Sequence, residues 1–452
     1  MFNLTQLRIA ARELFDHALT AVDAGRAVRQ AVQREGPNFW ICGQRFEVAE
    51  RKVYSIAIGK AAKAMAIALD DQLGDSLSSG LIVRPMIGYH QSRELVMTPR
   101  KFSTRWQWIE GGHPFPNQSS LEAARGAFDL LDQANQENAF VIFLISGGGS
   151  AMIEWPADED ISLADLQAAN KVLVGCGASI GEINEVRRTF SSVKGGRLAA
   201  RAPDCDQITL IVSDVPPGEE RNVASGPTME PAPGKAIPVE IVEKYKLASR
   251  LPPTILRVVR NYTKAADSDL RSIRKHFVLL TSSTALEATA QAARTRGFIA
   301  EVATEIADEP IEDGCKELLD RLSTTTRQIP SRQSETVCLL SAGEFSCPVR
   351  GSGIGGRNLE TALRLACLHQ ASNQPFVALC AGTDGIDGNS PAAGAIVDTT
   401  TLQRARAIGL DPREFLERSD AYSFFVALGD VIATGPTGTN VRDLRILLAG
   451  TS

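Results

Sequence analysis

The sequence predicts an α/β protein built from two domains. Three observations support this prediction: a length of 452 residues, a composition with 44% hydrophobic and 22% charged residues, and short apolar runs that alternate with helical stretches. The length is typical of two to three domains, and the composition is that of a globular protein with large cores. Strand-like runs that alternate with helices are typical of mostly parallel sheets.

In the N-terminal half, each predicted strand is followed by a helix or by a glycine-rich turn. Strands are expected at residues 53–58, 81–83, 140–145 and 208–212, and helices at 60–69, 120–135 and 163–174. Ser119 or Ser120 is the expected N-cap of the helix over 120–135, because a serine hydroxyl accepts backbone N–H bonds there. Residues 5–33 are expected to form an amphipathic helix.

Prolines interrupt this alternation over residues 228–270, so we expect a domain boundary there. The N-terminal domain would cover residues 1–250 and the C-terminal domain residues 275–452. The alternation then resumes, with strands expected at 277–280, 337–340, 376–380 and 444–448 and helices at 285–295, 357–369 and 423–428.

Charge and composition exclude several classes of protein. The net charge of −5 without a basic stripe argues against a nucleic-acid partner. Eight scattered cysteines indicate reduced thiols, and five dispersed histidines argue against a zinc site. No apolar run approaches the ~20 residues that span a bilayer, and no signal peptide is apparent. We therefore expect a cytoplasmic protein with no membrane partner.

Glycine-rich polar clusters follow several of the predicted strands. They are Gly59-Lys60, Ser146–Ser150, Gly351–Asn358, Thr383–Gly388 and Gly435–Asn440. Glycine leaves backbone N–H groups open to a ligand, and ligands of open α/β sheets bind at the carboxyl ends of strands. The clusters therefore predict sites for phosphates or carboxylates. The alternative is that they are tight turns in which backbone packs against backbone.

Several cations fit the same chemistry. A lysine at a helix N-terminus opposes the helix dipole, so Lys60 is better explained as an anion-binding group than as a solvated one. The segment 185–201 carries Arg187, Arg188, Lys194 and Arg197, which form either a solvated charged face or a cationic wall for an acidic ligand. Arg357 begins a helix, and its planar guanidinium suits bidentate contact with a phosphoryl group.

The acidic residues and one histidine allow more than one interpretation. Asp384 and Asp387 could bind magnesium or accept a proton from a hydroxyl, or they could simply form Asx-turns. His113 could be a general base or a hydrogen-bonded structural histidine. Residues 351–356 formally match the Gly-x-Gly-x-x-Gly fingerprint of dinucleotide sites, but the preceding strand and the acid about twenty residues beyond it are both missing.

Taken in order, these clusters resemble the glycerate 2-kinase family, whose C-terminal half is the MOFRL domain. The resemblance covers nearly the whole chain, and the matching stretches are 58–62, 112–116, 146–151, 184–198, 213–215, 224–228, 355–358, 383–388, 392–395 and 435–440. It implies a Rossmann-like N-terminal domain, a C-terminal MOFRL domain and a cleft between them that holds the site. It also implies ATP-dependent phosphorylation of D-glycerate, with ATP and Mg²⁺ as cofactors.

The resemblance points to Lys60, Arg357 and Asp214 as catalytic residues. Lys60 and Arg357 would neutralise charge on the moving phosphoryl group. Asp214 or Asp384 would bind magnesium or accept the hydroxyl proton, and the two roles stay unassigned between them. The residues expected to bind substrate or nucleotide are Gly59, Ser146, Gly147, Gly148, Gly149, Ser150, Arg187, Lys194, Glu344, Thr383, Asp384, Thr437 and Asn440.

Some positions depart from the family pattern and leave substrate selectivity open. Asn117 and the pair Glu219-Glu220 stand where the family usually has aspartates, and Leu359 replaces a usual glutamine. Two other functions also stay open: an NAD(P)H-dependent hydroxypyruvate reductase, and a non-catalytic sensor of phosphorylated hydroxy-acids. The sequence does not determine the oligomeric state, and a homodimer is one option.

Overall fold

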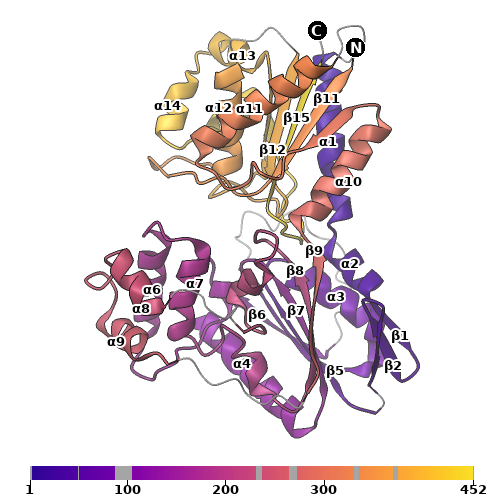
Figure 1. Cartoon of the computed structure of the whole chain (residues 1–452), viewed down its shortest axis with the longest axis vertical. Coiled ribbons are helices and arrows are strands. Elements are labelled where there is room, and N and C mark those ends of the chain that lie inside the picture. Colours follow the sequence, from indigo (N-terminus) through magenta and orange to yellow (C-terminus); the bar gives the residue numbers. More distant parts are fainter. Residues whose placement is uncertain are drawn as a thin grey trace. The chain divides into compact units, whose positions relative to one another are not determined.

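The chain folds into two compact α/β units. The computed structural model describes residues 3–48, 50–86, 104–230, 237–263, 272–329, 335–369 and 375–450. The N-terminal unit comprises Ala24–Leu279, and the C-terminal unit comprises Met1–Asp23 together with Leu280–Ser452 (Figure 1). The prediction of two α/β domains is confirmed. Residues 1–23, however, are part of the C-terminal unit and not of the N-terminal domain predicted over 1–250.

A six-stranded sheet lies at the centre of the N-terminal unit, with strand order β6-β5-β4-β7-β8-β9. Its strands are β4 (Val53–Ile58), β5 (Leu77–Pro85), β6 (Trp106–Gly111), β7 (Phe140–Ser146), β8 (Asp206–Val212) and β9 (Arg274–Leu280). The pairs β4–β5, β5–β6, β4–β7 and β7–β8 are parallel. This is the Rossmann order 3-2-1-4-5-6, whose switch point lies between β4 and β7. Both strands are buried throughout, as expected for a sheet covered on both faces.

Helices and a small antiparallel sheet surround this centre. The sheet consists of β1 (Val32–Glu35), β2 (Asn38–Ile41) and β3 (Gln44–Glu47). The helices are α2 (Ala24–Ala31), α3 (Ala62–Leu73), α4 (Gln118–Gln136), α5 (Gly149–Met152), α6 (Leu163–Val174), α7 (Ile180–Thr189), α8 (Pro238–Lys244) and α9 (Pro253–Asn261). Helices α6 to α9 share a separate apolar core. The N-cap of α4 is Asn117 and not a serine: Ser120 is the third helical residue and completes a capping box with Asn117.

The C-terminal unit contains a mixed sheet with strand order β10-β11-β15-β12-β13-β14. The strands are β10 (Ile299–Val302), β11 (Thr336–Ala342), β12 (Phe376–Gly382), β13 (Gly394–Asp398), β14 (Val431–Ile432) and β15 (Asp443–Gly450). Of its pairs only β10–β11 is parallel. The expectation of mostly parallel sheets is therefore wrong here. The connection from β12 to β13 is short and has no crossover helix, so these strands can only run antiparallel.

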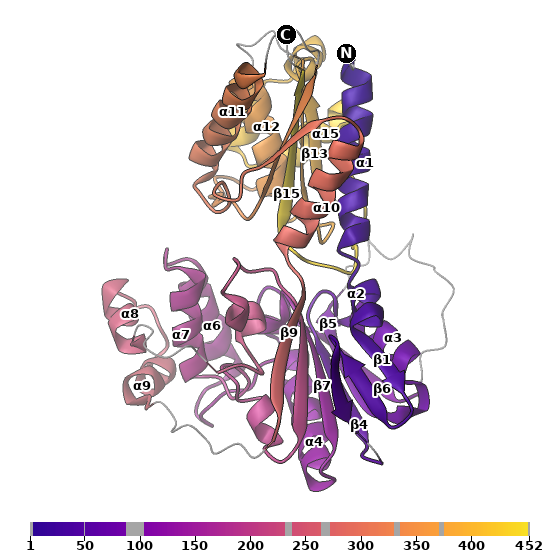
Figure 2. The ribbon, with the colours of Figure 1, turned by 45° about the vertical axis from the view of Figure 1, so that its right-hand side comes forward.

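Helices cover both faces of this second sheet (Figures 1 and 2). Helices α1 (Leu4–Ala21) and α10 (Ser282–Thr295) lie on one face, and α11 (Ile311–Gln328) and α12 (Arg357–His369) lie on the other. The short helices α13 (Thr401–Ala407), α14 (Pro412–Glu417) and α15 (Ala421–Leu428) pack beside α12. The unit is thus a three-layer α/β/α sandwich.

The predicted helix over residues 5–33 is divided between the two units, because α1 ends at Ala21 and α2 begins at Ala24. Helix α1 buries an apolar stripe that includes Leu7, Leu14 and Phe15. Its Arg8 forms ion pairs of 2.6 Å with Asp398 and with Asp430 at the sheet edge. Burial alone would raise the pKa of Asp398, but hydrogen bonds from Thr400 and the charge of Arg8 outweigh burial and lower the pKa. Helix α1 is therefore an integral part of the C-terminal unit.

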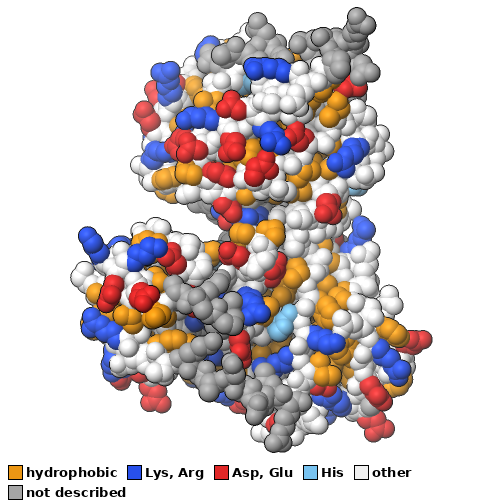
Figure 3. Space-filling model, in the orientation of Figure 1, with side chains coloured by type: hydrophobic (Ala, Val, Ile, Leu, Met, Phe, Trp, Pro, Cys, Tyr) orange, Lys and Arg blue, Asp and Glu red, His pale blue; other side chains and the backbone are white. Residues whose placement is uncertain are grey.

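Charges of both signs are distributed over the surface. Figure 3 shows basic and acidic side chains interspersed on the visible face of both units, with no extended basic stripe among the described residues there. In the described part of the chain, we find no helix that is both long enough and apolar enough to cross a membrane.

The Arg8 ion pairs can be tested through stability. Arg8→Met should lower the free energy of unfolding by about 2 kcal/mol, because it leaves two buried carboxylates with less compensation. The matched control is Arg12→Met on the same helix, since Arg12 pairs with Asp16 in solvent and exposed pairs contribute little. All four tryptophans lie in the N-terminal unit, so tryptophan fluorescence would not report on the C-terminal unit. Urea unfolding should therefore be followed by circular dichroism. Equal midpoints for both variants would contradict this role of Arg8.

Candidate active site

The switch point of the N-terminal sheet brings two of the predicted clusters together. Gly59 and Lys60 follow β4, and Gly147 and Gly148 follow β7, the strand beside it. Asp214 lies two residues beyond the end of β8, which pairs with β7, and is half-buried. The carboxyl ends of three neighbouring parallel strands therefore carry the predicted residues. Ligands bind at this position in open α/β sheets.

Ser146 ties the ends of β4 and β7 to each other. Its hydroxyl accepts a hydrogen bond of 3.0 Å from the Ala61 N–H and donates one of 3.2 Å to the Ile58 carbonyl. The Lys60 N–H donates to the Gly147 carbonyl at 2.9 Å. Gly59 adopts φ of +114°, and a Cβ there would lie 2.3 Å from the Ser146 carbonyl oxygen. Ser146 is thus buried and engaged inside the protein, where it fixes the backbone that presents Lys60.

Lys60, His113 and Gly148 are neighbours. A Cβ built on Gly148 would lie 3.2 Å from Lys60 Cγ and 3.2 Å from His113 Nε2, and Gly148 itself adopts a left-handed φ of +81°. Lys60 is half-buried and His113 is exposed. Any side chain at position 148 would fill the space beside the lysine. Glycine at position 148 therefore allows the loop to lie close to Lys60 and His113.

The cationic segment 185–201, which begins in α7, is not a solvated face, because three of its cations are buried. Arg187, Arg188 and Lys194 are 8%, 3% and 1% exposed. Lys194 pairs with the equally buried Glu154. Arg188 pairs with Glu185 at 2.6 Å and donates to the Asn222 side chain at 3.1 Å. The segment therefore forms a buried charge network, and the cationic wall for an acidic ligand stays a prediction.

In the C-terminal unit, three strand ends meet at one edge of the sheet. Strands β11 and β12 end there with Ala342 and Gly382, and β15 begins there with Asp443. Glu344 follows β11, and Thr383 and Asp384 follow β12. Antiparallel insertion of β15 adds Asp443 to the residues that the sequence predicts for this edge. Sequence reasoning missed Asp443 because it considered the ends of strands and not their starts.

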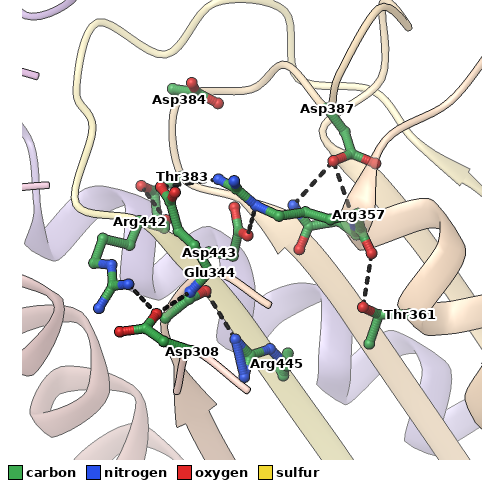
Figure 4. A network of polar contacts seen from close by, with 12 residues as sticks. Asp308, Glu344, Arg357, Thr361, Thr383, Asp384, Asp387, Arg442, Asp443 and Arg445 are labelled. Carbon is green, nitrogen blue, oxygen red and sulfur yellow. Dashed lines mark hydrogen bonds and ion pairs between the residues drawn. The ribbon is translucent and has the colours of Figure 1, made fainter. Parts of the chain in front are cut away.

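Arg357, the first residue of α12, points into this edge (Figure 4). Its Nε donates to Asp443, and a terminal nitrogen pairs with Glu344 Oε1 at 2.8 Å. Burial would lower the pKa of Arg357, but the two carboxylates outweigh burial and raise it. The side chain keeps 35% of its surface exposed. The guanidinium is thus permanently charged, oriented from within and still accessible.

Asp387 is a buried cap of α12. Its two carboxylate oxygens accept the N–H groups of Asn358 at 3.0 Å and of Leu359 at 2.8 Å, which lie in the first helical turn. Burial, the largest effect, together with the nearby charge of Asp443 raises the pKa of Asp387 to about 7. Asp384 Oδ1 accepts the Ile386 N–H at 3.1 Å, which confirms an Asx-turn at this position. The two aspartates of this loop therefore differ in role.

The glycines of the three C-terminal clusters mostly allow backbone to pack against backbone. A Cβ on Gly388 would lie 2.1 Å from the Gly355 carbonyl oxygen, and one on Gly385 would lie 1.9 Å from the Gly435 carbonyl oxygen. The three loops are thereby held against each other beside Arg357. At these two positions the tight-turn alternative explains the glycines. Gly435 differs, because a Cβ there would have nothing within 4 Å.

Polar side chains of these loops brace the same edge. Thr383 donates its hydroxyl to the Arg442 carbonyl at 2.7 Å, and Thr437 donates its hydroxyl to the Thr383 carbonyl at 2.6 Å. Asn440 Oδ1 accepts the Arg442 N–H at 3.4 Å. Asp308 pairs with Arg442 from the other side. Thr383, Thr437 and Asn440 thus make internal contacts, and Asp308 and Arg442 are members of the network that the sequence gave no local signal to find.

Metal binding at either edge would rest on few protein ligands. Across the described ranges, no group of three or more His, Cys, Asp or Glu side chains is arranged to hold a metal ion. Magnesium is commonly held by one or two carboxylates together with substrate phosphates. Single carboxylates such as Asp214 and Asp384 fit that mode of binding.

Comparison with known proteins places this geometry in a family. Residues 10–260 match a family described as a domain of unknown function, DUF4147, and residues 337–443 match the MOFRL family. A D-glycerate 2-kinase of Thermotoga maritima is 33% identical over 450 residues, which cover 99% of both chains. The chain belongs to the glycerate kinase family. A protein of Agrobacterium vitis with the provisional name hydroxypyruvate reductase is 38% identical over 87% of this chain and 98% of its own.

The fold comparison agrees with this membership. A crystal structure of the Thermotoga maritima glycerate kinase matches with a TM-score of 0.78 and 31% identity, covering 98% of this chain and 99% of the other. Lys60 and Asp214 lie in the segment that matches DUF4147. Arg357 and Asp443 lie in the segment that matches the MOFRL family. The resemblance stated from the motifs is confirmed.

The buried cap on α12 leads to a pH-dependent prediction. Because the pKa of Asp387 is about 7 in the folded protein and about 3.9 in an unfolded chain, the folded state binds the proton more tightly. The contribution of Asp387 to the free energy of unfolding is therefore largest below about pH 4 and falls as the pH rises towards 7. The stability advantage of the wild type over Asp387→Asn should shrink by about 2 kcal/mol between pH 5 and pH 8.

Urea unfolding at pH 5 and pH 8 measures this difference. The control is Asp411→Asn, which changes an exposed N-cap on α14. An Asp387→Asn difference that stays constant or grows from pH 5 to pH 8 would show that the carboxylate is stabilised in its charged form.

Proposed function

We propose that this chain is a glycerate 2-kinase, which transfers a phosphoryl group from ATP to a hydroxyl of D-glycerate. The observation that carries the proposal is the similarity to the Thermotoga maritima D-glycerate 2-kinase over 99% of both chains. The charged groups of the reaction would come from the switch point of the N-terminal sheet and from the polar edge of the C-terminal sheet. Phosphoryl transfer depends on positioning and on neutralising charge, and each edge presents a fixed cation.

Lys60 is proposed to bind phosphoryl oxygens. It follows the first strand of a Rossmann sheet at the switch point, and its backbone is fixed by Gly147. The glycines at 147–149 would add backbone N–H groups, which bind anions well where no Cβ intervenes. Ser146 is proposed as a positioning residue, because its hydroxyl is used inside the protein.

Arg357 is proposed to stabilise charge on the phosphoryl group as it moves. Asp443 and Glu344 hold its guanidinium in one orientation, so little side-chain freedom remains to be lost when a ligand binds. Thr383, Thr437 and Asn440 brace the loops around it and would act through that position. A planar guanidinium offers paired donors that suit phosphoryl oxygens.

Asp214 and Asp384 are proposed as the carboxylates that hold Mg²⁺ or accept the proton of the substrate hydroxyl. Bound magnesium would neutralise phosphate charge and orient the nucleotide. The choice between the two roles stays open for both residues. Lys194, whose charge is neutralised by Glu154, is proposed to shape its loop and not to contact a ligand.

A hydroxypyruvate reductase is the second candidate, because the Agrobacterium vitis relative has that provisional name. The dinucleotide fingerprint of a Rossmann sheet lies between its first strand and the following helix. In this chain that turn is Gly59-Lys60-Ala61, with a single glycine. The Gly-x-Gly-x-x-Gly match at 351–356 instead lies in the C-terminal unit, where Gly353 packs against Arg418 and Asp420. These two observations favour the kinase.

One pair of assays separates these functions. ADP release and NADH consumption should each be measured with D-glycerate and with hydroxypyruvate. We expect ADP release with D-glycerate and no NADH consumption with either acid. Phosphorus NMR of the product should identify 2-phosphoglycerate. NADH consumption with hydroxypyruvate would support the reductase, and ligand binding without either reaction would support a sensor.

The two cations can be tested individually. Lys60→Met and Arg357→Lys should each lower kcat by about 10³-fold or more, because a positioned cation contributes that much to phosphoryl transfer. The matched controls are Lys63→Met, an exposed lysine one turn further along the chain, and Arg364→Lys, which lies two turns along α12 from Arg357. Thermal unfolding of each variant checks the fold. Near-normal turnover in a folded Lys60 or Arg357 variant would reject the role of that residue.

We also propose the cytoplasm as the compartment, because all eight cysteines are free in the structure.

A further inference from the structure

Arg187 is a buried arginine whose charge the protein does not satisfy. The residue is 8% exposed, and its Nε is buried without a hydrogen-bond partner. In the part of the chain that the structure describes, its guanidinium forms no hydrogen bond or ion pair. Burial lowers the pKa of Arg187, and the charge of Glu154 opposes this shift only in part. Burying an unpaired charge is costly for a folded protein, so such a residue calls for an explanation.

The surroundings of Arg187 carry one excess positive charge. The charge of Glu154 acts on Arg187, but the two carboxylate oxygens of Glu154 already accept hydrogen bonds from Lys194 and from Ser191. Arg188, the next residue, is neutralised by Glu185 at 2.6 Å. Lys194 and Arg187 together thus share a single carboxylate. A single negative charge from outside the protein would complete this buried set.

Helix α7, which carries Arg187, is linked to the glycine loop at the switch point through Ser225. Asn184 lies one helical turn before Arg187 and therefore on the same face of the helix. Its side chain accepts a hydrogen bond of 2.9 Å from the Ser225 hydroxyl, which in turn lies 2.7 Å from the Ser150 hydroxyl of the loop. A chain of three side chains, joined by two short contacts, thus links the α7 face to the segment that follows β7.

The segment around Ser225 is strained in a way that keeps it close to this loop. Ala224 and Ser225 both adopt left-handed conformations, with φ of +50° and +62°, which non-glycine residues rarely adopt. A Cβ on Gly149 would lie 2.9 Å from Ala224 Cβ, so this segment packs directly on the loop. Strain of this kind is usually retained where a precise local geometry is needed.

We propose that Arg187 binds the carboxylate of the hydroxy-acid substrate, next to the Ser150–Ser225–Asn184 chain. This inference rests on the proposed function, because it assumes a carboxylate-bearing substrate at the switch point. A planar guanidinium pairs with a carboxylate through two parallel hydrogen bonds. One missing negative charge fits a carboxylate better than a triphosphate, which carries several. Such a site would also reject an analogue that lacks the acid group, since the buried cation would then stay unpaired.

Arg187→Met tests the inference, because methionine has a similar length and no charge. Calorimetric titration without ATP should show that the wild type binds D-glycerate at least about 10-fold more tightly than glycerol, which has the hydroxyls but no carboxylate. The variant should lose that preference. In turnover assays its KM for D-glycerate should rise at least about 10-fold while its KM for ATP stays within about twofold. Arg187→Lys keeps the charge but not the paired donors, so its KM for D-glycerate should lie between those of the wild type and Arg187→Met.

Thermal unfolding separates a ligand-binding arginine from a structural one. Because the buried charge is unpaired, the melting temperature of Arg187→Met should stay equal to that of the wild type or rise. The matched control is Arg188→Met, which removes an equally buried arginine with partners and should melt at a lower temperature while retaining the preference for D-glycerate. A lower melting temperature for Arg187→Met with unchanged binding of D-glycerate would overturn the inference. An equal loss of D-glycerate affinity in both variants would overturn it too.

The outcomes also separate this inference from the kinase proposal. A wild type that binds D-glycerate through Arg187 but releases no ADP would leave the carboxylate site standing and reject the kinase. If the wild type phosphorylates D-glycerate and Arg187→Met leaves the KM for D-glycerate unchanged, the kinase proposal stands and the carboxylate site is rejected. A wild type that binds D-glycerate no better than glycerol would overturn the carboxylate site.

Discussion

The antiparallel pairing of β15 with both β11 and β12 is the constraint on which the polar edge of the C-terminal unit depends. Because β15 runs against its neighbours, its first residue meets their carboxyl ends. Asp443 therefore reaches Arg357, although the two are 86 positions apart in the sequence. A parallel last strand would have left that edge without the carboxylate and the guanidinium without its orientation. The direction of one strand thus determines the electrostatics of this edge.

In the N-terminal unit, neutral groups fix the backbone that carries the cation. A serine hydroxyl and two glycine positions join the ends of β4 and β7, and the Lys60 N–H donates to the Gly147 carbonyl. The arginine at the other edge tolerates two carboxylates because it cannot be deprotonated and offers five donors.

Much of this arrangement could be predicted from the sequence, because it depends on local patterns. Buried apolar runs fixed the central strands, and glycines after them marked the switch point, since parallel strands end at one edge. The docking of α1 could not be predicted, because Arg8 finds Asp398 and Asp430 only in the folded sheet. Asp443 could not be predicted, because it stands at the start of β15 and meets the ends of β11 and β12 only through antiparallel pairing. The glycine clusters of the C-terminal unit were noticed correctly, but their main cause is close packing between loops, which no single segment displays.

The buried cations show why sequence pattern alone is insufficient for assigning function. Arg445 is 1% exposed, and its guanidinium donates to the Ser341 hydroxyl at 2.7 Å and to the Gly343 carbonyl at 2.8 Å while stacking on Phe345. Lys194 is equally buried and has a carboxylate partner. Arg187 is nearly as buried and has neither kind of partner. Only the folded structure separates the cations that stabilise the protein from the one whose burial requires a ligand to explain it.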